Sequence, residues 1–156
     1  MVEIQLPGAE ALRLTHLLMD INGTLTVDGH LLPGVTQRVQ ALGALLTPVL
    51  VTADTMGTAE AVARTLGAEL ARLEPERGAE QKLRLIEQLG PEQTVAIGNG
   101  RNDELMLQAA ALGIAVIQAE GAFWPTLQRA DLVFASVTDA LDALLTPARL
   151  VASLRP

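Results

Sequence analysis

Residues 15–26 read THLLMDINGTLT, and this stretch decides the fold. Residues 15–21 form an apolar run with the length and composition of a buried strand. Asp20 stands near the end of this run, and the Asn22-Gly23 pair that follows is a strong signal for a tight turn. An aspartate at a strand end is also ordinary turn chemistry. By itself, the stretch therefore predicts a buried strand with polar side chains at its carboxyl end.

The remainder of the chain alternates short apolar runs with helical periodicity, and Gly or Pro closes each pair. This alternation is typical of βαβ units and a parallel sheet. We predict an α/β fold in a single domain spanning residues 1–156, a three-layer α/β/α, Rossmann-like sheet of mostly parallel strands. The expected strands are 15–21, 48–52, 68–73, 94–98, 114–118 and 131–134. The expected helices are 33–46, 55–66, 79–89, 103–111 and 137–145. Residues 24–32, TLTVDGHLL, contain Asp28-Gly29, which predicts a small β-hairpin.

The composition narrows the class of protein. Of 156 residues, 49% are hydrophobic and 19% charged, the formal net charge is -7, and cysteine is absent. Disulfides, thiolate zinc sites and thiol nucleophiles are therefore excluded. The negative charge and the lack of a basic run make nucleic acid an unexpected partner. The apolar stretches 42–51 and 109–117 are too short to span a membrane, and no signal peptide is visible, so we expect a cytoplasmic protein.

Polar groups follow the predicted strands, and the carboxyl ends of parallel strands meet at one edge of a sheet. The strand that ends near Thr52 continues into Ala53 and Asp54, although Asp54 or Thr55 would also serve as an ordinary helix cap. Lys82 is the single lysine among 11 basic residues, in a position where a basic side chain is commonly just solvated. The strand 94–98 leads into the turn GNGRND at 98–103. Together with the turn after the first strand, these groups predict one site.

The order of these groups resembles the four motifs of the haloacid dehalogenase-like (HAD) superfamily. The matching residues are DINGTLT at 20–26, Thr52, Lys82 and GNGRND at 98–103. Within that superfamily, TAD at 52–54 and GNGRND are similar to the Thr-Gly-Asp and Gly-Asp-Gly-x-Asn-Asp motifs of P-type ATPase phosphorylation domains, and AALGIA at 110–115 and ADLV at 130–133 are similar to the segments that follow there. The resemblance covers residues 15–134. The segments between motifs are too short for a cap or nucleotide-binding domain, so the chain resembles a soluble, cap-free P-type ATPase-like phosphatase.

The resemblance implies a Mg²⁺-dependent phosphohydrolase in which Asp20 attacks phosphorus and forms an aspartyl phosphate. The catalytic residues that it implies are Asp20, Asn22, Thr52 and Lys82. The phosphate-binding residues that it implies are Ile21, Asn22, Gly23, Thr52, Ala53, Lys82 and Asn102. The magnesium ligands that it implies are Asp20, the backbone carbonyl of Asn22, Asn99, and Asp103 directly or through water.

Two residues depart from the family pattern. Asn22 stands where most HAD phosphatases have the Asp that gives general acid–base help, and an amide cannot protonate a leaving alkoxide. We therefore expect a preference for acyl phosphates, phosphoanhydrides or aryl phosphates over alkyl monoesters, and slow hydrolysis of the phosphoenzyme. Asn99 stands where the family has a magnesium-binding Asp. Because the amide carries no charge, we expect weaker magnesium binding, which Asn99→Asp should reverse.

Several alternatives follow from the same residues. The two missing carboxylates favour an impaired relative that binds phosphate or a phospho-ligand, or a phosphorylation-responsive regulator. A Rossmann oxidoreductase has little support, because no Gly-x-Gly-x-x-Gly follows the first strand. His16 and His30 have no partner spacing for zinc, and Trp124 is expected against the sheet edge or a neighbouring subunit. We expect a small phosphorylated substrate or a phosphoprotein, no nucleic-acid or membrane partner, and a homo-oligomer, because cap-free relatives of this size shield their sites by oligomerising.

Overall fold

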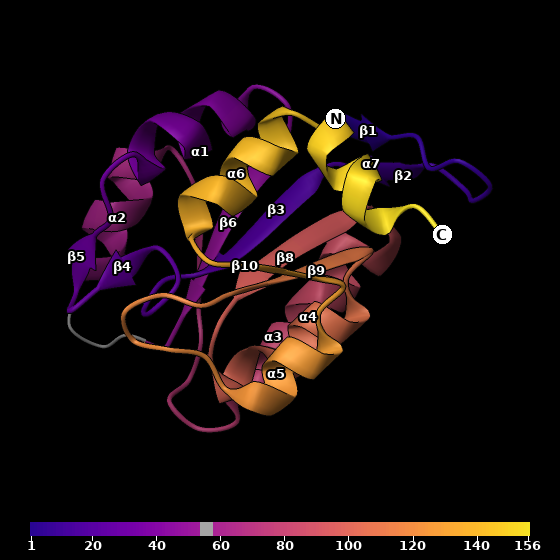
Figure 1. Cartoon of the computed structure of the whole chain (residues 1–156). Helices are drawn as coiled ribbons and strands as arrows, with labels where there is room; N and C mark the ends of the chain where they lie inside the picture. Colours follow the sequence, from indigo (N-terminus) through magenta and orange to yellow (C-terminus); the bar gives the residue numbers. More distant parts are fainter. Residues whose placement is uncertain (54–57) are drawn as a thin grey trace.

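A six-stranded sheet forms the centre of the computed structural model, which describes residues 1–53 and 58–156 (Figure 1). The strand order is β10-β9-β8-β3-β6-β7. All neighbouring strands in this sheet are parallel, which confirms the predicted α/β class. The strands are β3 (His16–Asp20), β6 (Thr47–Thr52), β7 (Glu69–Arg72), β8 (Thr94–Gly98), β9 (Leu112–Val116) and β10 (Leu132–Phe134).

Helices cover both faces of this sheet (Figure 1). One face packs against α1 (Val35–Gly43), α2 (Thr58–Leu66), α6 (Val137–Leu145) and α7 (Ala148–Leu154). The other packs against α3 (Gly78–Leu89), α4 (Glu104–Ala109) and α5 (Trp124–Arg129). Two short 3₁₀ turns, η1 (Pro91–Gln93) and η2 (Arg101–Asp103), lead into β8 and α4. The result is the predicted three-layer arrangement.

The alternation of side chains along β3 directs Asp20 toward α3. Leu17 and Met19 are buried in the core beneath α1 and α6, whereas Leu18 is buried in the core that includes Ile86 of α3. Residues two apart on a strand share a face, so Asp20 lies on the same side as Leu18. Lys82 lies four residues before Ile86 and hence on the same face of α3. The fold thus brings Lys82 and Asp20 together.

The strand order also places a crevice next to β3. The chain runs from β3 through β6 to β7 on one side and then crosses to β8, β9 and β10 on the other. Adjacent strands diverge in this way at a topological switch point, where open α/β sheets bind ligands beyond the carboxyl ends of the strands. The strands β3, β6 and β8 end at Asp20, Thr52 and Gly98. The predicted site residues therefore leave the sheet at the switch point.

The expected hairpin after the first motif is present. It consists of β4 (Thr26–Val27) and β5 (His30–Leu31), which pair in antiparallel fashion. Asp28 (φ 51°) and Gly29 (φ 76°) lie between these two strands, and both have left-handed backbone, as a type I′ turn requires. A second hairpin, β1 (Val2–Ile4) and β2 (Leu12–Leu14), was not predicted, because strands of three residues give too little periodicity. The helices α5 and α7 were also missed, because six and seven residues are fewer than two full helical turns.

Gly113 lies in a different type of element from the one predicted. This glycine was expected to end a helix, but it lies inside β9, which begins two residues before the expected strand. A Cβ at Gly113 would lie 2.2 Å from the backbone oxygen of Leu107, so glycine is needed where α4 approaches the sheet. The helix expected at 103–111 is shorter in the structure, where α4 ends at Ala109.

The capping residues expected at Asp54 and Thr55, and the start of the helix 55–66, lie outside the described residues. Within residues 1–53 and 58–156, no helix is long and apolar enough to cross a membrane.

Candidate active site

A cleft of about 350 Å³ opens at the carboxyl ends of the three central strands. The residues that line it come from the ends of β3, β6 and β8 and from the start of η2: Asp20, Asn22, Thr52, Ala53, Asn99, Gly100 and Asn102. Six of these seven are residues that the sequence placed in the site, and Gly100 is the addition. The fold therefore brings together motifs that lie far apart in the chain.

Lys82 does not line this cleft but lies behind Asp20, which does. Its side chain is fully buried, and Nζ donates hydrogen bonds to Asp20 Oδ1 at 2.7 Å and to Asp103 Oδ1 at 2.6 Å. A buried ammonium is tolerated only where opposite charges and hydrogen-bond acceptors surround it. We name these three residues the charge cluster. It has two carboxylates for one ammonium, so it is anionic when all three groups are ionised.

The pKa values of the cluster follow from its burial. Burial and the neighbouring Asp103 carboxylate raise the pKa of Asp20 from 3.8 to about 7, while Lys82 and a backbone hydrogen bond from Ile21 oppose this rise. Burial lowers the pKa of Lys82, but the charges of Asp20 and Asp103 outweigh burial, so its pKa lies above the ordinary value. Lys82 is therefore charged, and Asp20 changes its charge near neutral pH.

Asp103 is committed to the protein itself. Oδ1 accepts from Lys82, and Oδ2 accepts from the backbone N–H groups of Asn99 and Gly100 at 2.9 Å each. The residue is fully buried and does not line the cleft. A Cβ on Gly98 would lie 2.5 Å from its Cγ, so glycine makes room for this carboxylate. In the structure the Asp103 oxygens thus hold Lys82 and the β8 loop, and its binding of magnesium, directly or through water, stays a prediction.

Asn99 joins three segments around the cleft. Its Oδ1 accepts from Thr24 Oγ1 at 3.1 Å, and its Nδ2 donates to the carbonyl of Gly121 at 3.0 Å. Gly121 belongs to the segment after β9, and Thr24 to the turn after β3. Asn99 is thus a structural bridge as well as a residue of the cleft wall. Sequence reasoning assigned it only to metal binding and did not identify Thr24 or Gly121.

The turn after β3 is closed by its own backbone. The Ile21 carbonyl accepts from the N–H groups of Thr24, Leu25 and Thr26, and the N–H of Gly23 donates to the Thr26 carbonyl at 3.0 Å. The Gly23 N–H is therefore not directed at a phosphate, which corrects its predicted role. Neither Ile21 nor Gly23 lines the cleft, whereas Asn22 is exposed in it. The tight turn holds the backbone after Asp20 in place and leaves the Asn22 side chain exposed in the cleft.

Gln118 is a residue of this site that the sequence gave no reason to select. Its Nε2 donates to the carbonyls of Gly23 at 3.2 Å and Thr24 at 2.6 Å, and its Oε1 accepts from the N–H of Val137 at 3.0 Å. It thereby connects the turn after β3 to the first residue of α6. A glutamine just beyond a strand has no distinctive spacing, so only the tertiary structure identifies it as a support of the turn after β3.

The donors that face the cleft fit a magnesium ion that is shared with a phosphate. Among residues 1–53 and 58–156, no group of three His, Asp or Glu side chains is placed to hold a metal. The cleft does offer the Asp20 carboxylate and the oxygens of Asn22 and Asn99. Magnesium commonly binds through one or two carboxylates, with substrate phosphate and water completing its shell. Such a donor set suits an ion that binds together with its substrate.

Trp124 lies outside the cleft, and its side chain is not packed against the sheet edge. It is 66% exposed, so that expectation is wrong, and contact with a neighbouring subunit stays a prediction. His16 is within 3.0 Å of Thr15 Oγ1, and His30 is within 2.9 Å of the Asp28 carbonyl. Both contacts are local and structural.

Sequence comparisons with known proteins identify a family and two relatives. The family model of the haloacid dehalogenase-like hydrolases matches residues 2–111. An uncharacterized protein of Methanocaldococcus jannaschii is 47% identical over 78 residues, which are 47% of this chain and 84% of that protein. A probable copper-transporting ATPase of Arabidopsis thaliana is 31% identical over 118 residues, which are 71% of this chain and 12% of that protein.

Solved structures share the fold over nearly the whole chain. The 3-deoxy-D-manno-octulosonate 8-phosphate phosphatase of Moraxella catarrhalis, in complex with magnesium, phosphate and KDO, has a TM-score of 0.73 and 17% identity, and the match covers 90% of each chain. The cobalt-bound deoxy-D-mannose-octulosonate 8-phosphate phosphatase of Haemophilus influenzae has a TM-score of 0.73 and 18% identity, and the match covers 92% of this chain and 94% of that chain. Because the family model matches most of the sequence and the fold agrees, the chain belongs to the haloacid dehalogenase-like hydrolase family.

Proposed function

We propose that the protein is a Mg²⁺-dependent phosphohydrolase that acts through an aspartyl phosphate on Asp20. The observation that carries this proposal is the charge cluster, in which Lys82 Nζ lies 2.7 Å from Asp20 Oδ1. Phosphoryl transfer requires a positioned nucleophile and compensation of negative charge. Membership of a hydrolase family, and the magnesium and phosphate bound to the Moraxella catarrhalis phosphatase, support the proposal.

In the proposed reaction, a carboxylate oxygen of Asp20 forms a bond to phosphorus while the bond from phosphorus to the leaving oxygen breaks. The leaving group departs with the electron pair of that bond, and water then releases phosphate from Asp20. Lys82 compensates charge between Asp20 and the phosphoryl group, and Thr52 and Asn102 in the cleft wall hydrogen-bond to phosphoryl oxygens. Magnesium, when bound by Asp20, Asn22 and Asn99, supplies further charge compensation for the phosphate.

The leaving group sets the rate of this reaction. Asn22 is exposed in the cleft, where an Asp would serve as general acid, and its amide has no proton of suitable acidity to donate. General acid–base help is worth about 10² to 10⁴-fold, and alkoxides need it most. We therefore expect acyl phosphates, phosphoanhydrides and aryl phosphates as substrates. A specificity constant that is higher for a sugar phosphate than for acetyl phosphate would contradict this expectation.

Rapid-mix turnover of p-nitrophenyl phosphate tests the proposal. With magnesium, the protein should release a burst of nitrophenol followed by a slow steady rate, because the phosphoenzyme also lacks a base. Asp20→Asn should abolish both phases. Glu87→Gln, which removes a carboxylate from the exposed face of α3, should keep both, and chelation of magnesium should suppress both.

The same experiment decides the alternative. Asn99, whose amide is held by Thr24 and Gly121, favours a relative that binds a phospho-ligand without efficient turnover. In that case no release of nitrophenol depends on Asp20, while inorganic phosphate with magnesium still raises the melting temperature.

We also propose a homo-oligomer, with the β4–β5 hairpin as the contacting element. Light scattering gives the oligomeric state, and a monomer at all concentrations would exclude it.

A further inference from the structure

A second pocket of about 450 Å³ adjoins the catalytic cleft. One of its walls is the beginning of α3, with Arg77, Gly78 and Glu80, and the other is η2 and the start of α4, with Arg101, Asn102 and Glu104. Asn102 lines this pocket and also the cleft. The two hollows thus share one side chain as a common wall, and a ligand that extends past Asn102 leaves the cleft and enters the second pocket.

Two arginines flank the point at which these walls meet. The walls approach closely, since a Cβ on Gly78 would lie 3.7 Å from Asn102 Nδ2. Arg77 directly precedes Gly78, and Arg101 directly precedes Asn102. Among the ion pairs of the described residues, none includes either arginine. Two exposed guanidinium groups without a carboxylate partner therefore stand beside a cleft with the anionic charge cluster behind it.

Acidic residues also line this pocket. Glu104 Oε1 lies 3.3 Å from Arg129 Nε, so Glu104 is paired with an arginine outside the pocket. Glu80 is the other carboxylate of the lining, and Arg77 also lines the adjoining hollow with Glu74 and Glu76. Recognition of an anion here therefore relies on the directed N–H donors of the two guanidinium groups and not on a net positive charge.

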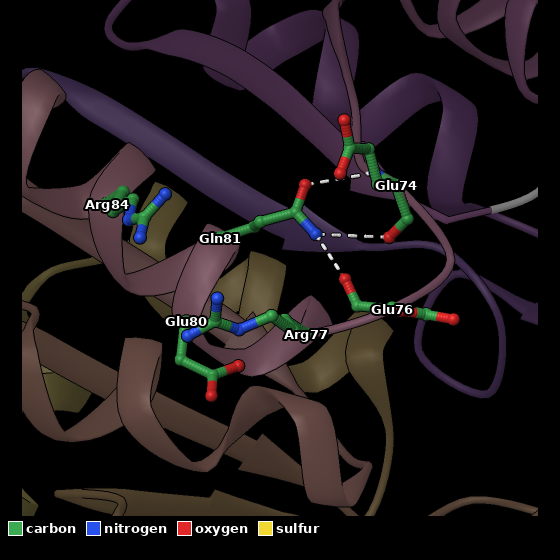
Figure 2. A pocket seen from close by; sticks show the side chains of 6 residues that line it. All are labelled: Glu74, Glu76, Arg77, Glu80, Gln81 and Arg84. Carbon is green, nitrogen blue, oxygen red and sulfur yellow. Dashed lines mark hydrogen bonds between the residues drawn. The ribbon is translucent and has the colours of Figure 1, made fainter.

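Neighbouring contacts hold the side chain of Arg101 and the backbone that leads to Arg77. The Arg101 guanidinium lies 5.5 Å from the centre of the Phe123 ring, in a cation–π arrangement. Arg77 has left-handed backbone (φ 63) at the start of α3. The segment before it is fixed by Gln81, whose Oε1 accepts from the Glu74 N–H and whose Nε2 donates to the carbonyls of Glu74 and Glu76 (Figure 2). Figure 2 shows the Arg77 side chain directed away from Glu76 and along the first turn of α3.

We propose that this pocket, which we name the arginine subsite (Arg77, Arg101 and Asn102), binds a second anionic group of the substrate. The inference rests on the proposed phosphohydrolase activity and specifies its substrate class. The preferred substrates are phosphate compounds that carry a further carboxylate or phosphoryl group on the leaving side. Arginine binds either group through paired N–H donors, so the shared chemistry is a planar or tetrahedral oxyanion.

Three aryl phosphates of similar shape test this inference. The compounds are 4-carbamoylphenyl, 4-carboxyphenyl and 4-phosphonophenyl phosphate, used together with their 3-substituted isomers because the isomers differ in reach. We expect kcat/KM for at least one anionic compound to exceed that of the carbamoyl compound by about tenfold or more, as charge-assisted hydrogen bonds allow. The carboxyl and phosphono arms identify the preferred oxyanion.

Variants assign the preference to the arginines. Arg77→Gln and Arg101→Gln should each reduce the ratio of kcat/KM between the anionic and carbamoyl compounds, and the double variant should bring it close to one. Arg84→Gln removes the same charge from the exposed face of α3, outside the subsite, and should leave the ratio unchanged. A ratio of one in the native protein, or a ratio that both arginine variants leave intact, overturns the inference.

Binding separates failure of the subsite from failure of catalysis. In Asp20→Asn, which cannot form the phosphoenzyme, calorimetry gives the Kd of each compound directly. Tighter binding of an anionic compound that disappears in the double arginine variant supports the subsite even if no compound is turned over. Turnover that depends on Asp20 without any such preference leaves the phosphohydrolase in place and removes the subsite.

Discussion

Gly23 lies directly beneath the side-chain amide of Asn99. A Cβ at residue 23 would be 2.5 Å from Asn99 Nδ2, and the backbone there has a φ of 77°. Gly23→Ala therefore strains the backbone and displaces Asn99 from Thr24 and Gly121. The left-handed backbone alone costs about 1–2 kcal/mol, so we expect a larger loss in the free energy of unfolding measured with urea.

Gly29→Ala is the matched control for this prediction. Gly29 has a similar φ of 76°, but no atom lies within 4 Å of the place where its Cβ would be. It therefore reports the backbone strain without the contact. If both variants lose the same stability, and Gly23→Ala keeps full turnover as Gly29→Ala does, the contact with Asn99 has no part in holding the site.

Asn99→Asp should tighten magnesium binding and weaken the metal-free protein. A carboxylate cannot donate to the Gly121 carbonyl as Nδ2 does at 3.0 Å, and it adds negative charge near Asp20. We expect a lower melting temperature with a chelator and a larger rise on adding magnesium than in the native protein. Asn102→Asp adds the same charge at an exposed position of the cleft. It should lower the melting temperature measured with a chelator less than Asn99→Asp does. Equal magnesium responses in native protein and Asn99→Asp would remove residue 99 from the metal site.

Asp20→Asn should stabilise the metal-free protein increasingly as pH rises. The pKa of Asp20 is raised to about 7, so between pH 3.8 and about 7 the folded chain keeps a proton that the unfolded chain releases. The free energy of unfolding of the native protein falls through that window, and an amide escapes the loss. The melting temperature of the variant minus that of the native protein should therefore increase from pH 4 to pH 7 and then level off.

Asp142→Asn provides a control of opposite sign. Its hydrogen bond to Arg38 lowers the pKa of Asp142, so the native ion pair stabilises the protein above the ordinary pKa and loses this effect as pH falls. This pair is partly exposed, so the effect should be small. If the melting temperature of Asp20→Asn minus that of the native protein decreases toward neutral pH, the electrostatics described for the charge cluster are wrong.

Gln118→Met should reduce kcat more than it changes KM. Gln118 donates to the carbonyls of Gly23 and Thr24 and does not itself line the cleft, so we expect it to act as a positioning residue for the Asp20 turn. A small displacement of a reacting group can cost up to about a hundredfold in rate, and we expect about tenfold here. Steady-state kinetics with p-nitrophenyl phosphate give both constants.

Gln118→Glu and Gln40→Met sharpen this test. The glutamate still accepts from the Val137 N–H but cannot donate to the turn, so it should also lower kcat. Gln40 of α1 donates to the Thr65 carbonyl of α2 and does not line the cleft, so its loss should leave both constants unchanged. If Gln118→Met raises KM alone, the residue has a structural role without influence on the nucleophile.

The sequence predicted the sheet because long buried strands carry a strong periodic signal. The run at 15–21 and the strand at 94–98 correspond to β3 and β8 within two residues. Asp20, Thr52 and Asn99 were found because they follow such strands. Gln118, Arg77 and Thr24 could not be assigned in this way, since their partners come from distant segments and no spacing marks them. The contacts of Asp103 with Lys82 and with the β8 loop could not be predicted either, because a motif gives residue types and not the direction of a carboxylate.

The distance in sequence between Lys82 and Asp20 has a consequence for biosynthesis. The two are 62 residues apart, and α3 follows β3, α1 and β6 in the chain. A ribosome therefore releases the nucleophile strand and its neighbour well before the lysine. Until α3 emerges, the Asp20 carboxylate has no ammonium to compensate a phosphoryl group. If the proposed reaction is correct, we expect a nascent chain to be inactive toward phosphate compounds until α3 has emerged and β8 has paired with β3.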